Sequence, residues 1–171
     1  MNDKRFLTVM AVFDNKTQEL LGAMQSKIIE NVGDGTQTMG IPFHLTLGSY
    51  PVESESESEI VTRIEEVTAL TKPFEVLLVR YNTFSDKVLF LEPTKPKELI
   101  DLRKSFECDY ANGFNWVPHA TLFSGEVDDV KKAKSYLPDI CEPIRAQIVG
   151  IELGEFFPPK KIIRIDFNIR N

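Results

Sequence analysis

Two short segments of the sequence share the pattern histidine, any residue, threonine, leucine. They are His44-Leu45-Thr46-Leu47 and His119-Ala120-Thr121-Leu122, and they contain both histidines of the 171-residue chain. Histidine can take up or release a proton near neutral pH without a large shift of its pKa. A threonine hydroxyl can donate a hydrogen bond to a negatively charged oxygen. The repeated pattern therefore indicates acid–base chemistry close to an anionic group.

The spacing within each segment has a structural meaning if the segment is a β-strand. Side chains on a strand point alternately to its two faces. His44 and Thr46 would then share one face, and the leucines between and after them would anchor the other. The second segment repeats this arrangement with His119 and Thr121. Each copy would present one imidazole and one hydroxyl, which is half of a site.

The elements that must position these residues follow from the hydrophobic periodicity and from the breaker residues. We expect strands over residues 6–13, 43–47, 74–81, 87–91, 118–123, 144–153 and 161–169. We expect helices over residues 15–31, 96–109 and 128–137, and a further helix that begins within the Ser/Glu run 53–59 and ends before Pro73. Asn15 and Gln18 resemble a capping box at the start of the first helix.

The order of these elements occurs twice along the chain. Each half contains a His-x-Thr strand, a helix, a proline, a long strand and a final strand, and His44, Pro73 and Lys87 in one half correspond to His119, Pro143 and Lys161 in the other. This repetition predicts a single α+β domain spanning residues 1–171. We expect the domain to be bilobal and internally duplicated, with antiparallel sheets, flanking helices and a central cleft. Each of the two pseudo-symmetric lobes would contribute one His-x-Thr strand.

Two lobes related by a pseudo-two-fold axis would bring the two half-sites together across the cleft. One imidazole could then remove a proton from a nucleophile while the other gives a proton to a leaving oxygen. In-line displacement at phosphorus has this geometry, because the attacking and leaving oxygens lie on opposite sides of the phosphorus atom. Thr46 and Thr121 could donate hydrogen bonds to the charged oxygens between them.

The paired motifs, their separation and the duplicated halves resemble the two-histidine (2H) phosphoesterase superfamily, and within it the 2′-5′ RNA ligase-like branch. The resemblance covers most of the chain, from about Phe6 to Ile169. It implies metal-independent phosphodiesterase chemistry, without a cofactor, on 2′,3′-cyclic phosphates or on 2′-5′ linked nucleotides or RNA ends. It also implies that His44, Thr46, His119 and Thr121 form the catalytic quartet. Which histidine is the base and which is the acid stays open at this point.

The chain departs from this family in one respect. Members that process RNA often carry an arginine shortly after the second motif, where this chain has Leu122-Phe123-Ser124-Gly125. The missing charge favours hydrolysis of a smaller cyclic phosphate over RNA ligation. By strand parity Phe123 shares the face of His119 and Thr121, so we expect it, Ser124 and the nearby Trp116 to contact the substrate.

Two other functions fit the repeated motif. The first is a module that binds a nucleotide or an RNA end without turning it over. The second is a metal site, but two histidines need a further carboxylate or thiolate ligand, and the motif supplies only hydroxyls. We therefore expect no bound metal.

The composition limits the class of partner and the cellular compartment. A net charge of −6 argues against binding to a long nucleic-acid duplex, which normally requires a basic surface. No apolar run approaches the roughly 18–20 residues that span a membrane. Cys108 and Cys141 have no CxxC spacing, and we expect both to be reduced thiols in the core. Together with the family resemblance, which implies a small nucleotide or an RNA terminus as the substrate, these features lead us to expect a cytoplasmic monomer.

Overall fold

The computed structural model describes residues 5–53, 56–107 and 115–169. The strands are β1 (Phe6–Phe13), β2 (His44–Pro51), β3 (Phe74–Phe84), β4 (Val88–Pro93), β5 (Ala120–Ser124), β6 (Ile144–Phe156) and β7 (Pro159–Asp166). The helices are α1 (Asn15–Val32), α2 (Glu57–Leu70), α3 (Lys97–Ser105) and α4 (Val127–Ser135). Every predicted strand and helix is present, with ends that differ by a few residues. None of the helices in the described ranges is long and apolar enough to cross a membrane.

The strands form an antiparallel sheet in the order β2-β1-β6-β3-β4-β5, and β7 pairs with β6 beside this path. The predicted α+β class with antiparallel pairing and flanking helices is confirmed. The first part of β6 pairs with β3 and its later part pairs with β1 and β7, so the two halves of the sheet are continuous. The two motif strands, β2 and β5, lie at opposite ends of the strand order.

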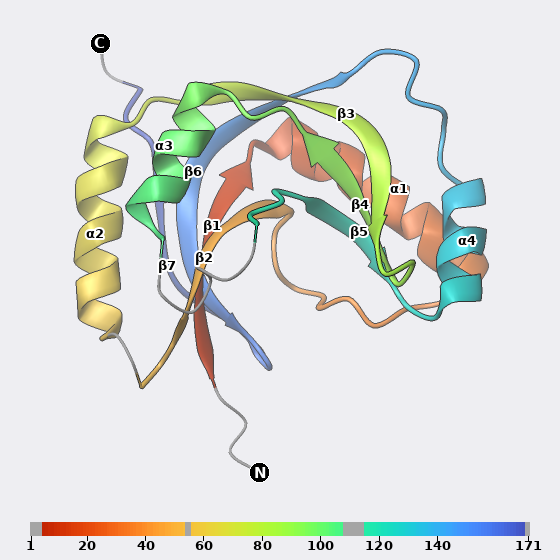
Figure 1. Ribbon diagram of the computed structural model, residues 1–171, viewed down its shortest axis with the longest axis horizontal. Helices are drawn as coiled ribbons and strands as arrows, with labels where there is room; N and C mark the ends of the chain where they lie inside the picture. The colour runs from red at the N-terminus through yellow and green to blue at the C-terminus, as the bar shows by residue number, and fades with distance from the viewer. Residues whose placement is uncertain (1–4, 54–55, 108–114, 170–171) are drawn as a thin grey trace.

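The four helices cover the two ends of this curved sheet in pairs (Figure 1). Helices α1 and α4 pack together and against β5, whereas α2 and α3 pack together on the half that contains β2, β6 and β7. Consequently α1, which precedes the first motif, packs beside the second motif strand. Helix α3, which precedes the second motif, packs beside the first motif strand.

The pairing registers of the two halves correspond residue by residue. The centre is the antiparallel pairing of β3 with β6, in which Phe74 pairs with Ile148 and Leu78 with Ile144. Beyond this centre β6 pairs with β1 and β3 pairs with β4, and both ladders contain one register shift at the corresponding position. This correspondence supports the duplication inferred from the sequence, and we propose that the domain consists of two pseudo-symmetric lobes.

Each motif strand contains a β-bulge at the leucine of its His-x-Thr-Leu segment. In β2, Thr46 pairs with Met10 and Gly48 pairs with Val9, so Leu47 has no partner on β1. In β5, Thr121 and Phe123 pair with consecutive residues of β4, so Leu122 has no partner on β4. A bulge interrupts the alternation of side chains. In each strand the bulged leucine and the residue after it are therefore both buried.

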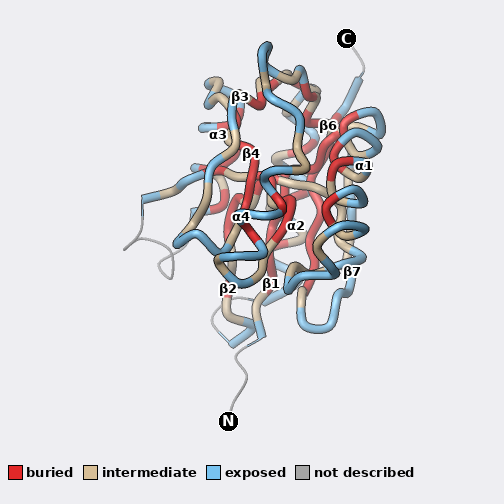
Figure 2. Tube along the Cα trace, turned by 90° about the vertical axis from the view of Figure 1, so that its right-hand side faces the viewer, coloured by how far each residue is buried: buried red, intermediate tan, exposed pale blue. Residues whose placement is uncertain are grey.

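The hydrophobic core runs along the middle of the sheet and under the helices (Figure 2). Strand β1 is buried along almost its whole length, as expected for a strand with neighbours on both sides. Cys141 is exposed, so the expectation that it lies in the core is wrong. It lies in the irregular segment before Pro143 that joins α4 to β6. Cys108 lies outside the described residues.

The local signals at the helix starts are partly as predicted. Helix α1 is capped by the Asp14 carboxylate, which accepts a hydrogen bond from the Thr17 amide, so the cap lies one residue before the predicted Asn15. Helix α2 begins with a capping box between Ser56 and Glu59, which accounts for part of the Ser/Glu run. Acidic side chains at this end also interact favourably with the helix dipole.

Candidate active site

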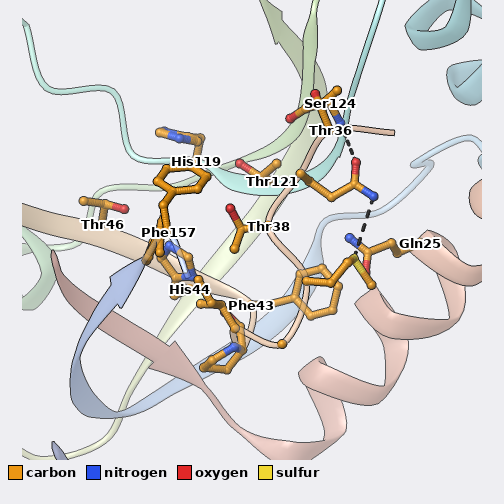
Figure 3. Close-up of a pocket in the computed structure, with 16 residues that line it drawn as sticks. Gln25, Thr36, Thr38, Phe43, His44, Thr46, His119, Thr121, Ser124 and Phe157 are labelled. Carbon is orange, nitrogen blue, oxygen red and sulfur yellow. Dashed lines mark hydrogen bonds between the residues drawn. The ribbon is translucent and has the colours of Figure 1, made fainter. Parts of the chain in front are cut away.

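A cavity of about 280 Å³ lies between the two motif strands and contains all four motif residues. His44 and Thr46 lie on β2, at one end of the strand order. Thr121 lies on β5, at the other end, and His119 directly precedes β5. Figure 3 shows Thr46 and His119 at the opposite end of the cavity from Gln25, with Thr121 between them. The structure therefore brings together the four residues that the sequence singled out.

Both imidazole rings are held in the same way. His44 Nδ1 lies 2.7 Å from the carbonyl oxygen of Pro42, and His119 Nδ1 lies 2.8 Å from the carbonyl oxygen of Val117. A carbonyl oxygen can only accept, so Nδ1 carries the hydrogen in each ring. The neutral ring then has its lone pair on Nε2. No described residue hydrogen-bonds to this nitrogen in either histidine, so it is available to a ligand.

Aromatic rings enclose both histidines. The Phe156 ring makes an edge contact with His44 at a centroid distance of 5.7 Å, and the Phe84 ring makes one with His119 at 4.8 Å. Burial lowers the pKa of His44 from 6.5 to about 4, the hydrogen bond to Pro42 opposes this change, and a charge on His119 adds to it. Burial also lowers the pKa of His119, against the hydrogen bond to Val117.

The two threonine hydroxyls are available to a ligand. Thr46 and Thr121 are partly buried and line the cavity, and neither hydroxyl has a hydrogen-bond partner within the described part of the chain. A hydroxyl in this position can donate to an oxygen of a bound phosphate without first breaking a bond inside the protein.

The segment between α1 and β2, residues 33–43, forms one wall of the cavity and was not predicted to belong to the site. The Thr36 amide donates to the Ser124 carbonyl at 2.7 Å, and the Ser124 amide donates to Gln37 Oε1 at 3.0 Å. These bonds hold the segment against the end of β5, where Thr36 and Thr38 line the cavity. The run of polar residues Thr36-Gln37-Thr38, a short distance before the first motif, was the available signal.

The predicted substrate contact of Phe123 is wrong. Its side chain is 1% exposed and belongs to the hydrophobic core. The prediction assumed regular alternation after Thr121, but the bulge at Leu122 turns Phe123 to the inner face. The same bulge places Ser124 on the cavity face, where it lines the cavity, and its contact with a substrate stays a prediction.

Trp116 lies beside the quartet, next to Thr46 and His119. Its indole Nε1 donates to the Thr46 carbonyl at 3.0 Å, so this residue of the segment before β5 supports the first motif. Trp116 lines a second cavity of about 300 Å³, which shares Thr46 and His119 with the first. A ligand in that second cavity would contact Trp116.

Each bulged leucine is also held by a side chain from a helix of the other half. Gln25 on α1 donates from Nε2 to the Leu122 carbonyl at 2.8 Å, and Arg103 on α3 donates from Nη1 to the Leu47 carbonyl. A bulge leaves the carbonyl of the extra residue without a partner in the strand ladder. The two helices satisfy this carbonyl in both motifs, which holds each threonine against the cavity.

No three His, Cys, Asp or Glu side chains in residues 5–53, 56–107 and 115–169 come together in a group that could hold a metal ion.

Residues 32–155, which include both motifs, match the family model of the 2′-5′ RNA ligase superfamily. The chain belongs to this superfamily. The family predicted from the paired motifs is therefore confirmed. A search of curated protein sequences finds no match.

Solved structures show the same fold at low sequence identity. Escherichia coli LigT complexed with NADP+ matches with a TM-score of 0.60 and 16% identity, over 96% of this chain and 99% of LigT. LigT complexed with 3′-AMP matches with a TM-score of 0.60 and 15% identity, over 97% and 99% of the two chains. The protein TT0787 of Thermus thermophilus matches with a TM-score of 0.64 and 14% identity, over 95% and 97%.

Proposed function

We propose that the protein is a metal-independent phosphodiesterase that hydrolyses a 2′,3′-cyclic phosphate or a short 2′-5′ linked nucleotide. The observation that carries this proposal is the common orientation of the two histidines. Each Nδ1 is engaged by the carbonyl two residues earlier, which leaves two Nε2 atoms for the ligand in one cavity. General acid–base catalysis at a phosphodiester needs two such groups.

The electrostatics favour one assignment of roles. A charge on His119 is among the causes that lower the pKa of His44, which favours a neutral His44 while His119 carries the proton. In the hydrolytic direction His44 would then act as the base that activates water, and His119 as the acid that protonates the leaving oxygen. Thr46 and Thr121 would donate hydrogen bonds to the non-bridging oxygens of the phosphate.

The alternative function is a nucleotide-binding module on the same fold. LigT has been crystallised with 3′-AMP, ATP and NADP+, so a relative of this fold binds small nucleotides. Binding alone would use the threonine hydroxyls but would not require two histidines with free Nε2 atoms.

The test is turnover of adenosine 2′,3′-cyclic phosphate and of 2′-5′ linked diadenylate by the purified protein. We expect hydrolysis that is unchanged by EDTA, and a loss of about 10²–10⁴-fold in kcat for His44→Ala and for His119→Ala. Lys131→Ala, on the exposed face of α4, is the matched control and should retain full activity. Binding of these nucleotides without any turnover would support the binding module, and loss of activity in EDTA would favour a metal enzyme.

A further inference from the structure

The second cavity beside the quartet contains a buried cation. Arg103 on α3 is 9% exposed, and it lines this cavity together with Trp116, Thr46 and His119. Its guanidinium donates to the Leu47 carbonyl and lies 5.6 Å from the centre of the Trp116 ring. Across the described segments of the chain, no carboxylate forms an ion pair with it.

A cation in this environment favours an anionic ligand. Removing a charged group from water is costly unless an opposite charge or several hydrogen bonds replace the water. One carbonyl oxygen and one aromatic face use only part of the five donors of a guanidinium. Because Arg103 lines the second cavity, an anion that enters this cavity can accept hydrogen bonds from the remaining N–H groups of the guanidinium. Phosphate suits the planar guanidinium well, since it can accept two parallel hydrogen bonds.

The two cavities are pseudo-symmetric counterparts. Gln25 lines the first cavity and holds the bulge of the second motif, whereas Arg103 lines the second cavity and holds the bulge of the first motif. The serine two residues after each bulge, Ser124 or Ser49, also lines the corresponding cavity. At equivalent positions, helix α1 therefore carries the neutral amide of Gln25 and helix α3 carries the positive charge of Arg103.

We infer that the cavity of Arg103 and Trp116 binds a second phosphate group of the substrate. This inference rests on the proposed function, because it assumes that the phosphodiester under attack lies on the quartet. A phosphodiester has a substituent on each side. The second cavity shares Thr46 and His119 with the first, and Figure 3 shows these two residues at the end of the first cavity away from Gln25. Arg103 then supplies the positive charge that is missing after the second motif, and the substrate class becomes nucleotides with an additional phosphate.

The test compares adenosine 2′,3′-cyclic phosphate with the same compound carrying a 5′-phosphate. We expect the wild-type protein to have a kcat/KM at least about tenfold higher for the 5′-phosphorylated substrate, since a hydrogen bond to a charged group is worth roughly this factor or more. Arg103→Gln should bring this ratio close to one. Gln25 shows that a glutamine on the equivalent helix can reach a bulge carbonyl, so Arg103→Gln can keep the support of Leu47 while it removes the charge.

Two further variants distinguish a phosphate contact from a purely structural role. Arg103→Lys keeps the charge and should keep most of the preference. Lys104→Gln removes a positive charge from the exposed face of the same helix and should leave the ratio unchanged. If Arg103→Gln lowers kcat/KM equally for both substrates, or if the wild-type protein has no preference, Arg103 only positions the first motif and the inference is wrong.

A protein that turns over neither substrate would contradict the proposed function but would still allow this test. Calorimetric titration with adenosine 3′,5′-bisphosphate and adenosine 3′-monophosphate then measures the same preference as a ratio of Kd values. We expect tighter binding of the bisphosphate and loss of the difference in Arg103→Gln. Equal affinity of the wild-type protein for the two nucleotides would overturn the inference.

Discussion

At the scale of single residues, the environment of each histidine follows from the carbonyl group and the aromatic rings around it. The backbone places Nδ1 of His44 on Pro42 and Nδ1 of His119 on Val117, so one tautomer is selected in both rings. The surrounding phenylalanines then disfavour the charged form of both imidazoles. The free protein at neutral pH therefore has two neutral imidazoles with their lone pairs directed to a ligand.

The lowered pKa of His44 predicts a specific loss of stability in acid. The unfolded chain protonates His44 near pH 6.5, whereas the folded chain protonates it only near pH 4. Between these values the unfolded state binds more protons, so the contribution of His44 is complete above pH 6.5 and is lost as the pH falls to about 4. A shift of this size corresponds to at most about 3 kcal/mol.

Urea unfolding of the wild-type protein and of His44→Gln at pH 7, 5.5 and 4.5 measures this contribution. The free energy of unfolding should fall more steeply with acidification in the wild-type protein than in His44→Gln, which has no titrating ring at this position. Any other groups that titrate in this range are common to both proteins and cancel in the difference. Parallel pH dependences of the two proteins would contradict the burial of the His44 ring.

At the scale of elements, the sequence predicted the strands and the helices, because hydrophobic periodicity and breaker residues determine these locally. It predicted the meeting of the two motifs from the repeated order of these elements. It could not predict the bulges at Leu47 and Leu122, since a bulge depends on the register of the neighbouring strand. The error on Phe123 follows from this. Arg103 and Gln25 were also missed, because their contacts link a helix of one half to a strand of the other.

The bulge in β2 explains the requirement for a glycine directly after Leu47. A Cβ atom on Gly48 would lie 2.3 Å from the carbonyl oxygen of Phe106, a backbone atom next to the end of α3. We expect Gly48→Ala to lower the free energy of unfolding by about 1–3 kcal/mol, as overpacking of a core does. Since Thr46 lies two residues away, kcat should fall as well.

Gly22→Ala in helix α1 is the matched control for this substitution. A Cβ atom at Gly22 would approach the Phe43 ring only to 3.9 Å, which is an ordinary contact. Alanine is the better helix former, so Gly22→Ala should stabilise the protein by about 0.5–1 kcal/mol. Denaturant unfolding of both variants measures the contrast, and equal stability of Gly48→Ala and the wild-type protein would refute the close approach.

At the scale of the whole molecule, the site belongs to neither half of the sequence. Helix α1 supports the motif of the second half through Gln25, and helix α3 supports the motif of the first half through Arg103. The cavity between β2 and β5 exists only because the continuous sheet brings these two edges face to face. The two histidines have equal backbone contacts but different surroundings, which would allow them to take the different roles proposed for them.

The most direct test of this division of roles is the pH dependence of kcat/KM for the wild-type protein, His44→Ala and His119→Ala. The pKa of His44 is about 4 and that of His119 lies below 6.5, so the wild-type profile should be bell-shaped with its maximum on the acid side of pH 6.5. The acid limb should disappear in His44→Ala and the alkaline limb in His119→Ala. A wild-type profile without these limbs, or variants that keep both of them, would contradict acid–base catalysis by the two histidines.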